Sequence, residues 1–266
     1  MLENLIPVSL ENSLRQVTAS VFSNIPLIEP KRFQKFIAEL NYQKFELLRQ
    51  RTISLNVGKD DLDNAGHPIK DVGFRMINFN NEGRINKVIQ VEQRDSKEKN
   101  NKDTVIYNFQ TLKYPGWEIF KEDLLSNLSA ISKEDNPFIN AVSLNYVNEF
   151  MWQGEEEIAI EQIFNRDADF MSHKFFKSQN SSCAVNTEDY YETYKSIEQL
   201  EVVVSKNRNL ILTNSQIVFE FINPIKFYTS IEDGTFEDSI EKIHIEIKNY
   251  LKQLFTEEVK SKINLL

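Results

Sequence analysis

Residues 141–152 read AVSLNYVNEFMW, and this stretch decides how the rest of the chain is interpreted. Val142, Leu144 and Tyr146 alternate with polar residues such as Asn145. An alternation with period two places apolar side chains on one face of a β-strand and polar side chains on the other. The stretch therefore predicts a strand near the centre of a sheet.

One face of this predicted strand is rich in large rings. Tyr146, Asn148, Phe150 and Trp152 share that face, whereas Glu149 points the other way. An aromatic and amide face can line a ligand cleft, or it can form core beneath a covering helix. We expect core, because large rings at period two suit a sheet that a helix covers.

Shorter strands are expected on both sides of this segment. Residues 80–83 (NNEG) and 206–209 (KNRN) have the composition of β-hairpin connections. Residues 165–187 show no clear period and predict an irregular segment. The expected strands are residues 14–22, 45–57, 72–79, 85–93 and 104–112 before the central strand, and residues 197–204, 210–213 and 217–222 after it.

Two long amphipathic helices are expected, one starting near Trp117 and one near Phe236, with a shorter helix over residues 31–40. In the last helix Thr235 and Asp238 have the spacing of a capping box, a pair of side chains that bond free backbone N–H groups. Apolar residues of that helix recur at intervals of three and four and predict a buried stripe: Ile240, Ile243, Ile247, Tyr250, Leu251, Leu254 and Phe255.

This order of elements predicts an α+β fold. We expect one or more antiparallel sheets with helices packed on one face, arranged as two loosely similar halves. A single domain over residues 1–266 is expected, with a half-boundary near residues 134–138. The two halves are similar in their order of strands and helices, and their residues show no evident duplication.

Composition argues against several classes of protein. The formal net charge of −9 disfavours a nucleic-acid partner, and Cys183 is the single cysteine, so no internal disulfide can form. The 7 glycines have none of the spacings of dinucleotide-binding, P-loop or serine-hydrolase motifs, and there is no H-E-x-x-H motif. The N-terminus lacks the features of a signal peptide, and no apolar run is long enough to span a bilayer. We therefore expect a cytoplasmic protein without membrane contact.

His244 is a candidate catalytic residue on the flank of the stripe in the last helix. Partial burial, Glu241 and Lys248 would tune its pKa as a general base. The alternative is a structural histidine that hydrogen-bonds the helix to the sheet. We expect the structural role, because no Ser or Cys nucleophile lies nearby in the sequence.

Two other groups are candidate binding residues. Asp167, Asp169 and His173 are chemically suited to a divalent metal, but three such residues in a charged loop more often form a solvated surface, so neither a metal nor a cofactor is expected. Three tyrosines crowd a polar stretch, and exposed tyrosines are enriched in protein–protein interfaces. These candidate protein-binding residues are Tyr190, Tyr191 and Tyr194.

Three blocks together resemble an uncharacterised, sporadically distributed bacterial family of proteins of about this length. They are residues 114–120 (YPGWEIF), residues 143–148 (SLNYVN), and residues 240–263 with His244 and Phe255. The resemblance runs from about residue 14 to the end of the chain. It implies this order of elements, but the family has no assigned activity.

The chain departs from the family pattern at two places. Glu220 and Asn223 stand where paired aspartates are usual in the strand before the last helix. Residues 58–71 have the character of an insertion. The resemblance therefore supports the shape of the protein and adds little chemistry.

The absence of a catalytic motif, the acidic charge and the tyrosines favour a non-catalytic role. We expect a protein-interaction or regulatory accessory protein of a small bacterial gene module, such as a defence or toxin–antitoxin locus, with a protein partner and a homodimer as an option. The alternatives are a metal-dependent or His-assisted hydrolase, and a small-ligand binding module with a deep apolar pocket.

Overall fold

A computed structural model describes residues 2–8, 13–23, 45–53, 69–94, 104–133 and 136–265. The expected helix over residues 31–40 lies outside these described residues.

The predicted central strand is confirmed as β7 (Phe138–Trp152), the middle of the sheet. One edge of β7 pairs with β2 (Leu14–Ser23) and, further along, with β1 (Leu5–Pro7). The other edge pairs with β10 (Leu210–Lys226). Leu144 lies opposite Ala19 on one side and Ile217 on the other, and all three side chains are buried.

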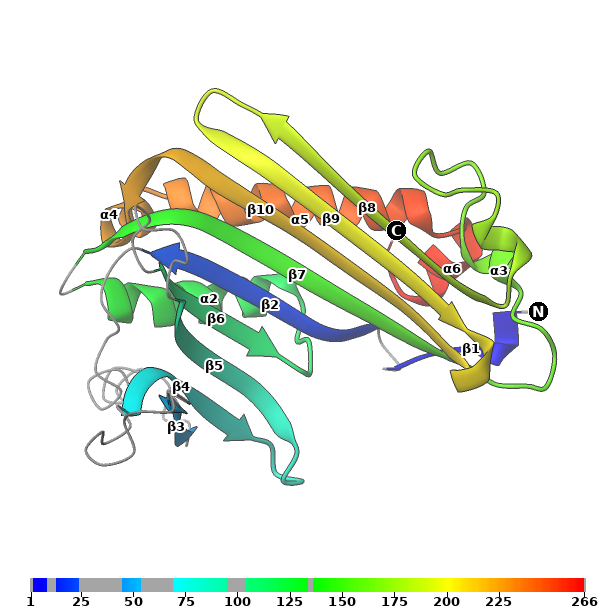
Figure 1. Cartoon of the computed structure of the whole chain (residues 1–266), viewed down its shortest axis with the longest axis horizontal. Coiled ribbons are helices and arrows are strands. Elements are labelled where there is room, and N and C mark those ends of the chain that lie inside the picture. Colours follow the sequence, from blue (N-terminus) through cyan, green and yellow to red (C-terminus); the bar gives the residue numbers. More distant parts are fainter. Residues whose placement is uncertain are drawn as a thin grey trace, which may run out of the picture.

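The described strands form one continuous ten-stranded sheet (Figure 1). The order is β3-β4-β5-β6-β2-β7-β10-β9-β8, with β1 beside β7, and every pair is antiparallel. Both predicted hairpins are confirmed, between β4 and β5 and between β9 and β10. The remaining strands are β3 (Phe45–Ile53), β4 (Ile69–Phe79), β5 (Ile85–Arg94), β6 (Thr104–Thr111), β8 (Asn180–Tyr190) and β9 (Tyr194–Ser205).

The longest described helix, α5 (Thr235–Leu254), contacts β7 and β10, and its predicted apolar stripe is buried except for Tyr250, which is half-buried. Among the described residues, no helix combines the length and the apolar character that crossing a membrane requires. The other helices are α2 (Trp117–Ser132), α3 (Ile160–Ile163), α4 (Phe227–Glu232) and α6 (Glu257–Lys262), with single 3₁₀ turns at Leu2–Asn4, Phe175–Lys177 and Lys206–Arg208.

The predicted α+β fold of antiparallel sheets with helices packed on one face and two loosely similar halves is wrong. The structure is mostly antiparallel strand, 49% by residue, in one large sheet with five short helices in the described chain. The reason lies in β2, which inserts between β6 and β7 and joins the two runs of strands into one sheet. Such a long-range pairing leaves no local signal in the sequence.

The predicted irregular segment over residues 165–187 is wrong in its last third, where β8 begins at Asn180. β8 is an edge strand and most of its residues are exposed, so no apolar alternation marks it. The earlier part is irregular in the structure and is anchored by Ala168, Met171 and Phe175, which are buried.

The two predicted strands over residues 210–213 and 217–222 are one strand, β10. The polar residues between them stay in the sheet because their backbones pair with β7 on one side and β9 on the other. Asn214 also accepts a hydrogen bond at 2.6 Å from Asn145 on β7.

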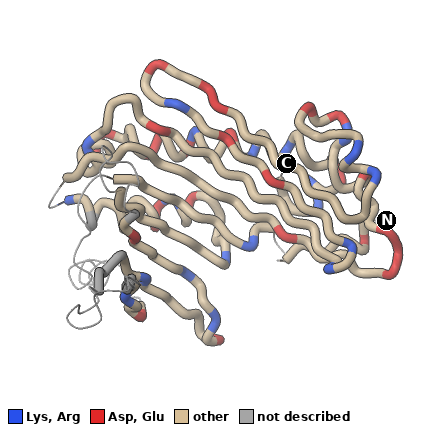
Figure 2. The backbone as a smooth tube through the Cα atoms, viewed as in Figure 1, with Lys and Arg blue, Asp and Glu red and all other residues tan. Residues whose placement is uncertain are grey.

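Figure 2 shows acidic and basic residues interspersed along the described backbone. One acidic run, residues 155–157, forms the exposed loop after β7 and lies near the N-terminus. The side chain of Lys206 donates hydrogen bonds to the backbone carbonyls of Gly154 and Glu156 and so ties this loop to the β9–β10 turn.

Candidate ligand-binding site

His244 lies on the inner side of α5 and is 8% exposed. Its ring stacks on the indole of Trp117, with centroids 4.0 Å apart and planes 6° from parallel. Its Nδ1 lies 2.6 Å from the hydroxyl oxygen of Tyr146 on β7, within hydrogen-bonding distance. The imidazole is therefore held on one side by a ring and at one nitrogen by a phenol.

Trp117, the first residue of α2, is held in turn by charged groups. Its Nε1 donates to Glu241 Oε2 at 2.8 Å, and Lys121 Nζ lies 3.0 Å from the same oxygen. Burial raises the pKa of Glu241, but the bonds from Trp117 and Lys121 outweigh it and lower that pKa. Glu241 is therefore a carboxylate at neutral pH, and its bonds fix the plane of the indole against His244.

Three titratable groups at the stack, His244, Tyr114 and Tyr146, are uncharged at neutral pH, in contrast with Glu241 behind the indole. Burial lowers the pKa of His244 to about 4; Glu241 opposes this effect, and Lys248 and Lys121 add to it. Burial raises the pKa of Tyr114 to about 12, although its hydrogen bond with Tyr146 opposes this. Burial also raises the pKa of Tyr146 well above the ordinary value for tyrosine. The site therefore has aromatic walls with neutral polar tips.

A cavity of about 230 Å³ lies against this group. The rings of Tyr114, Trp117 and Tyr146 line it together with His244. Leu251 and the C-terminal residues Ile263 and Leu265 add apolar wall. The cavity is therefore built from the turn before α2, from β7, from α5 and from the end of the chain, and its lining combines rings and aliphatic groups with a few polar atoms.

The polar floor of the cavity is fixed by its own hydrogen bonds. Asn148, which is 2% exposed, accepts a bond from Ser13 Oγ at 2.8 Å. Its amide nitrogen donates to Thr213 Oγ1 on β10 at 3.1 Å. Because these bonds join β7 to its neighbours on both sides, the floor is part of the rigid sheet and its shape is formed without a ligand.

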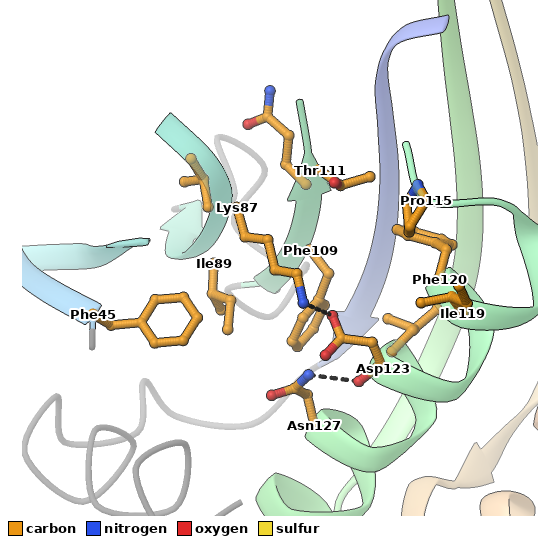
Figure 3. Close-up of a pocket in the computed structure, with 13 residues that line it drawn as sticks. Phe45, Lys87, Ile89, Phe109, Thr111, Pro115, Ile119, Phe120, Asp123 and Asn127 are labelled. Carbon is orange, nitrogen blue, oxygen red and sulfur yellow. Dashed lines mark hydrogen bonds and ion pairs between the residues drawn. The ribbon is translucent and has the colours of Figure 1, made fainter. Parts of the chain in front are cut away.

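A second depression lies between α2 and the strands β5 and β6 (Figure 3). Figure 3 shows the ammonium of Lys87 turned toward the carboxylate of Asp123, and this ion pair of 2.8 Å crosses the depression. Its volume is only about 40 Å³, space for a few waters. The cavity beside Tyr146 is the better candidate for an organic ligand.

The three predicted protein-binding tyrosines occupy the β8–β9 hairpin but differ in environment. Tyr190 is 76% exposed. Tyr191 stacks on Tyr194 with centroids 4.7 Å apart, and Tyr194 stacks on Phe219 at 4.2 Å. Lys242 of α5 lies over these rings and donates a hydrogen bond to the hydroxyl of Tyr194. Tyr191 and Tyr194 therefore pack against other side chains of the chain, and Tyr190 is the most exposed of the three.

The candidate metal residues lie apart from the cavity. Asp167, Asp169 and His173 are exposed on the segment between α3 and β8. The part of the chain that the structure describes contains no group of three or more His, Cys, Asp or Glu side chains that could hold a metal ion.

The sequence singled out His244, and it offered the face with Tyr146 and Asn148 as either a cleft lining or core. Both residues are buried, as expected of core, and they also line the cavity. Tyr114 and Trp117 were not recognised as their partners. Tyr114, Trp117, Tyr146 and Asn148 come from two of the blocks quoted for the family resemblance, and His244 comes from the third. These residues meet in one cavity because α5 packs against β7. No local sequence pattern reveals that contact.

Comparison of the chain with models of known protein families and with curated protein sequences gives no match. The resemblance to the bacterial family described above therefore stays a prediction.

Proposed function

We propose that this protein binds a small organic molecule in the cavity between β7 and α5. The observation that carries the proposal is the cavity itself, about 230 Å³ lined by three aromatic side chains and aliphatic groups with a few polar atoms. This composition is typical of ligand sites, in which apolar walls supply affinity and a small number of polar groups orient the ligand.

The volume limits the size of the ligand. An apolar protein cavity of about 150 Å³ accommodates benzene. A cavity of about 230 Å³ therefore suits one ring with a short substituent, or a small fused ring. Flat molecules fit best, because ring-on-ring contacts with Tyr114 and Trp117 then add to the burial of apolar surface.

Binding is favoured over catalysis by the state of His244. With a pKa lowered to about 4 by burial, its imidazole is a weak base at neutral pH. Its Nδ1 already bonds Tyr146 and its ring face is covered by Trp117. These contacts suit a rigid wall residue better than the proton carrier of a His-assisted hydrolase.

The proposal predicts millimolar or tighter binding of flat aromatic probes, measured by ligand-observed NMR and isothermal titration calorimetry. We expect wild-type protein to bind at least one of cinnamamide, cinnamate, indole-3-acetamide and indole-3-acetate. Leu265→Trp should abolish binding, because the larger ring fills the cavity from the end of the chain.

Ser261→Trp is the matched control, since Ser261 is exposed near the same end of the chain and does not line the cavity. Binding that survives Leu265→Trp would place the probes elsewhere. Failure of all four probes to bind wild-type protein would contradict the proposal.

The protein-interaction role predicted from the sequence is the second candidate function, with a second copy of this chain as the partner. The observation that favours it is the outer edge of β8, which pairs only with β9 within the described residues (Figure 1). β8 contains no Pro and pairs without a bulge, so its outer backbone N–H and C=O groups can pair with another strand, and its two acidic residues, Glu188 and Asp189, lie at one end.

Antiparallel self-pairing centred on Val185 would place Ser182 opposite the partner's Glu188, so the acidic residues of the two copies would stay apart. Both side chains are exposed and lie on one face of the strand. We therefore expect dimers by sedimentation equilibrium, with Ser182→Lys tightening the dimer several-fold and Ser182→Glu weakening it similarly. A monomer for both wild type and Ser182→Lys would contradict this candidate.

A further inference from the structure

The lining of the β7–α5 cavity includes one formally charged side chain, Lys248. His244 lies four residues earlier on the same helix and is neutral at pH 7, because burial lowers its pKa to about 4. The tyrosines of the lining are neutral as well, since burial raises the pKa values of Tyr114 and Tyr146. The site thus carries a single positive charge in a chain of net charge −9.

Lys248 has no hydrogen bond or ion pair among the described residues, in contrast with Lys87 and Lys121. Lys121 lies near three carboxylates and Lys87 is paired with Asp123. Lys248 is half-buried at the cavity, and its charge contributes to lowering the pKa of His244. A half-buried ammonium without a partner favours a negatively charged ligand, because opposite charges attract more strongly away from bulk water.

The other polar groups of the lining can complete such a contact. The hydroxyl of Tyr114 is protonated and accepts a hydrogen bond from Tyr146, so its own proton can be donated into the same cavity. An ammonium and a phenol that donate to one anion form charge-assisted hydrogen bonds, which are stronger than bonds between neutral groups. The rings and aliphatic walls on the remaining sides suit the uncharged body of the same molecule.

We infer that the ligand is a small monocarboxylic acid with a flat apolar body, whose carboxylate meets Lys248 and Tyr114 while its ring lies against the aromatic wall. This inference rests on the proposed function, because it names the class of molecule that the cavity takes up. A carboxylate is favoured over a phosphate because one ammonium balances one negative charge, and a phosphate group would also use much of the 230 Å³.

The test compares each acid with its neutral amide of the same shape. Wild-type protein should bind cinnamate and indole-3-acetate about tenfold or more tightly than cinnamamide and indole-3-acetamide, because hydrogen bonds to a charged group contribute more than neutral ones. Lys248→Met keeps the stem of the side chain and removes the charge. In this variant the acids should lose their advantage while the amides bind as before.

Lys252→Met is the matched control, because Lys252 lies one turn further along α5, has the same type of side chain and does not line the cavity. It should keep the preference for acids. Equal affinities of acid and amide in wild type would overturn the carboxylate inference while leaving the cavity as a binding site. If neither the acids nor the amides bind the wild-type protein, both the carboxylate inference and the proposed function are contradicted.

Discussion

Replacing Phe255 with alanine is expected to lower the free energy of unfolding by about 3–5 kcal/mol, the usual cost of removing a buried phenylalanine ring. Phe255 is 1% exposed and follows the last residue of α5. Its ring stacks on Phe164, with centroids 5.7 Å apart, and meets Phe150 of β7 edge-on at 5.7 Å. The substitution leaves a cavity between three packed elements that cannot close without moving the sheet or the helix.

Backbone hydrogen bonds at the same point explain why local collapse would not relieve the loss. Asn165 N–H donates to the carbonyl of Leu254 at 2.8 Å, and Thr256 N–H donates to that of Ile163 at 3.1 Å. These bonds hold α3 and the end of α5 at a fixed spacing. A small inward shift of α3 or of the end of α5 therefore cannot fill the space that loss of the Phe255 ring leaves.

Urea denaturation followed by circular dichroism measures this effect. Ile245→Ala, on the same helix at a side chain that is 49% exposed, is the control and should change the free energy of unfolding by less than about 0.5 kcal/mol. A loss below about 1 kcal/mol for Phe255→Ala would contradict the packing described for this corner of the core.

The parts of the fold that the sequence predicted are those in which one face is buried along a whole element. Residues 141–152 alternate because β7 has paired strands on both edges and one face under a helix. The stripe of α5 repeats every three or four residues because it packs on β7 and β10. In both cases local periodicity and tertiary burial agree, so a short window of sequence carries the information.

The missed elements are those in which tertiary context replaces local signal. β8 has no fully buried side chain, because it is an edge strand of this sheet and is exposed to solvent over most of its length. The polarity of Asn214 and Ser215 suggested a break, but β10 runs through them because their backbones pair with β7 and β9 and Asn214 accepts a hydrogen bond from Asn145.

The predicted capping box of α5 is also wrong, for a local reason. The cap is Gly234, which has the left-handed backbone conformation (φ 84°), and Thr235 is already helical. Asp233 Oδ1 accepts the Thr235 N–H at 3.0 Å, and the Asp238 N–H, which the capping box would have bonded to the Thr235 side chain, donates to the carbonyl of Gly234. Glycine tolerates the positive φ that this entry into the helix requires, so the boundary shifted by one residue.

The candidate site was predictable only in part. The sequence indicated His244 because it is an ionisable residue beside a predicted buried stripe. The hydrogen bond from helix to sheet expected of a structural histidine is present in its contact with Tyr146. The stack on Trp117 joins residues 127 positions apart in the chain. No spacing rule links such residues, so the cavity that they form could be found only from the folded chain.

The burial of His244 also leads to a second large effect, on stability against acid. Its pKa is about 4 in the folded protein and about 6.5 in an unfolded chain. As the pH falls below 6.5 the unfolded chain takes up a proton that the folded protein does not, so stability decreases until the pH nears 4. Between pH 7.5 and 4.5 this single residue should remove about 2 kcal/mol from the free energy of unfolding.

Other groups titrate in this range and must be separated from His244. Burial raises the pKa values of Glu198 and Glu246, so their contribution has the opposite sign and favours the folded state as the pH falls. Glu241, whose pKa is lowered, stays ionised over most of the range and faces His244 together with Lys248 and Lys121. The contribution of His244 is therefore measured as the difference between wild type and a variant without the imidazole in how the free energy of unfolding changes with pH.

His244→Gln is the suitable variant, because an amide can still bond the Tyr146 hydroxyl but takes up no proton in this range. Urea denaturation at several pH values should show the wild-type free energy of unfolding falling relative to the variant by about 2 kcal/mol from pH 7.5 to 4.5. His173→Gln, at an exposed loop position, should follow the wild-type curve. Parallel curves for wild type and His244→Gln would mean that water reaches the imidazole freely, and the enclosed aromatic wall proposed for the ligand cavity would fail with it.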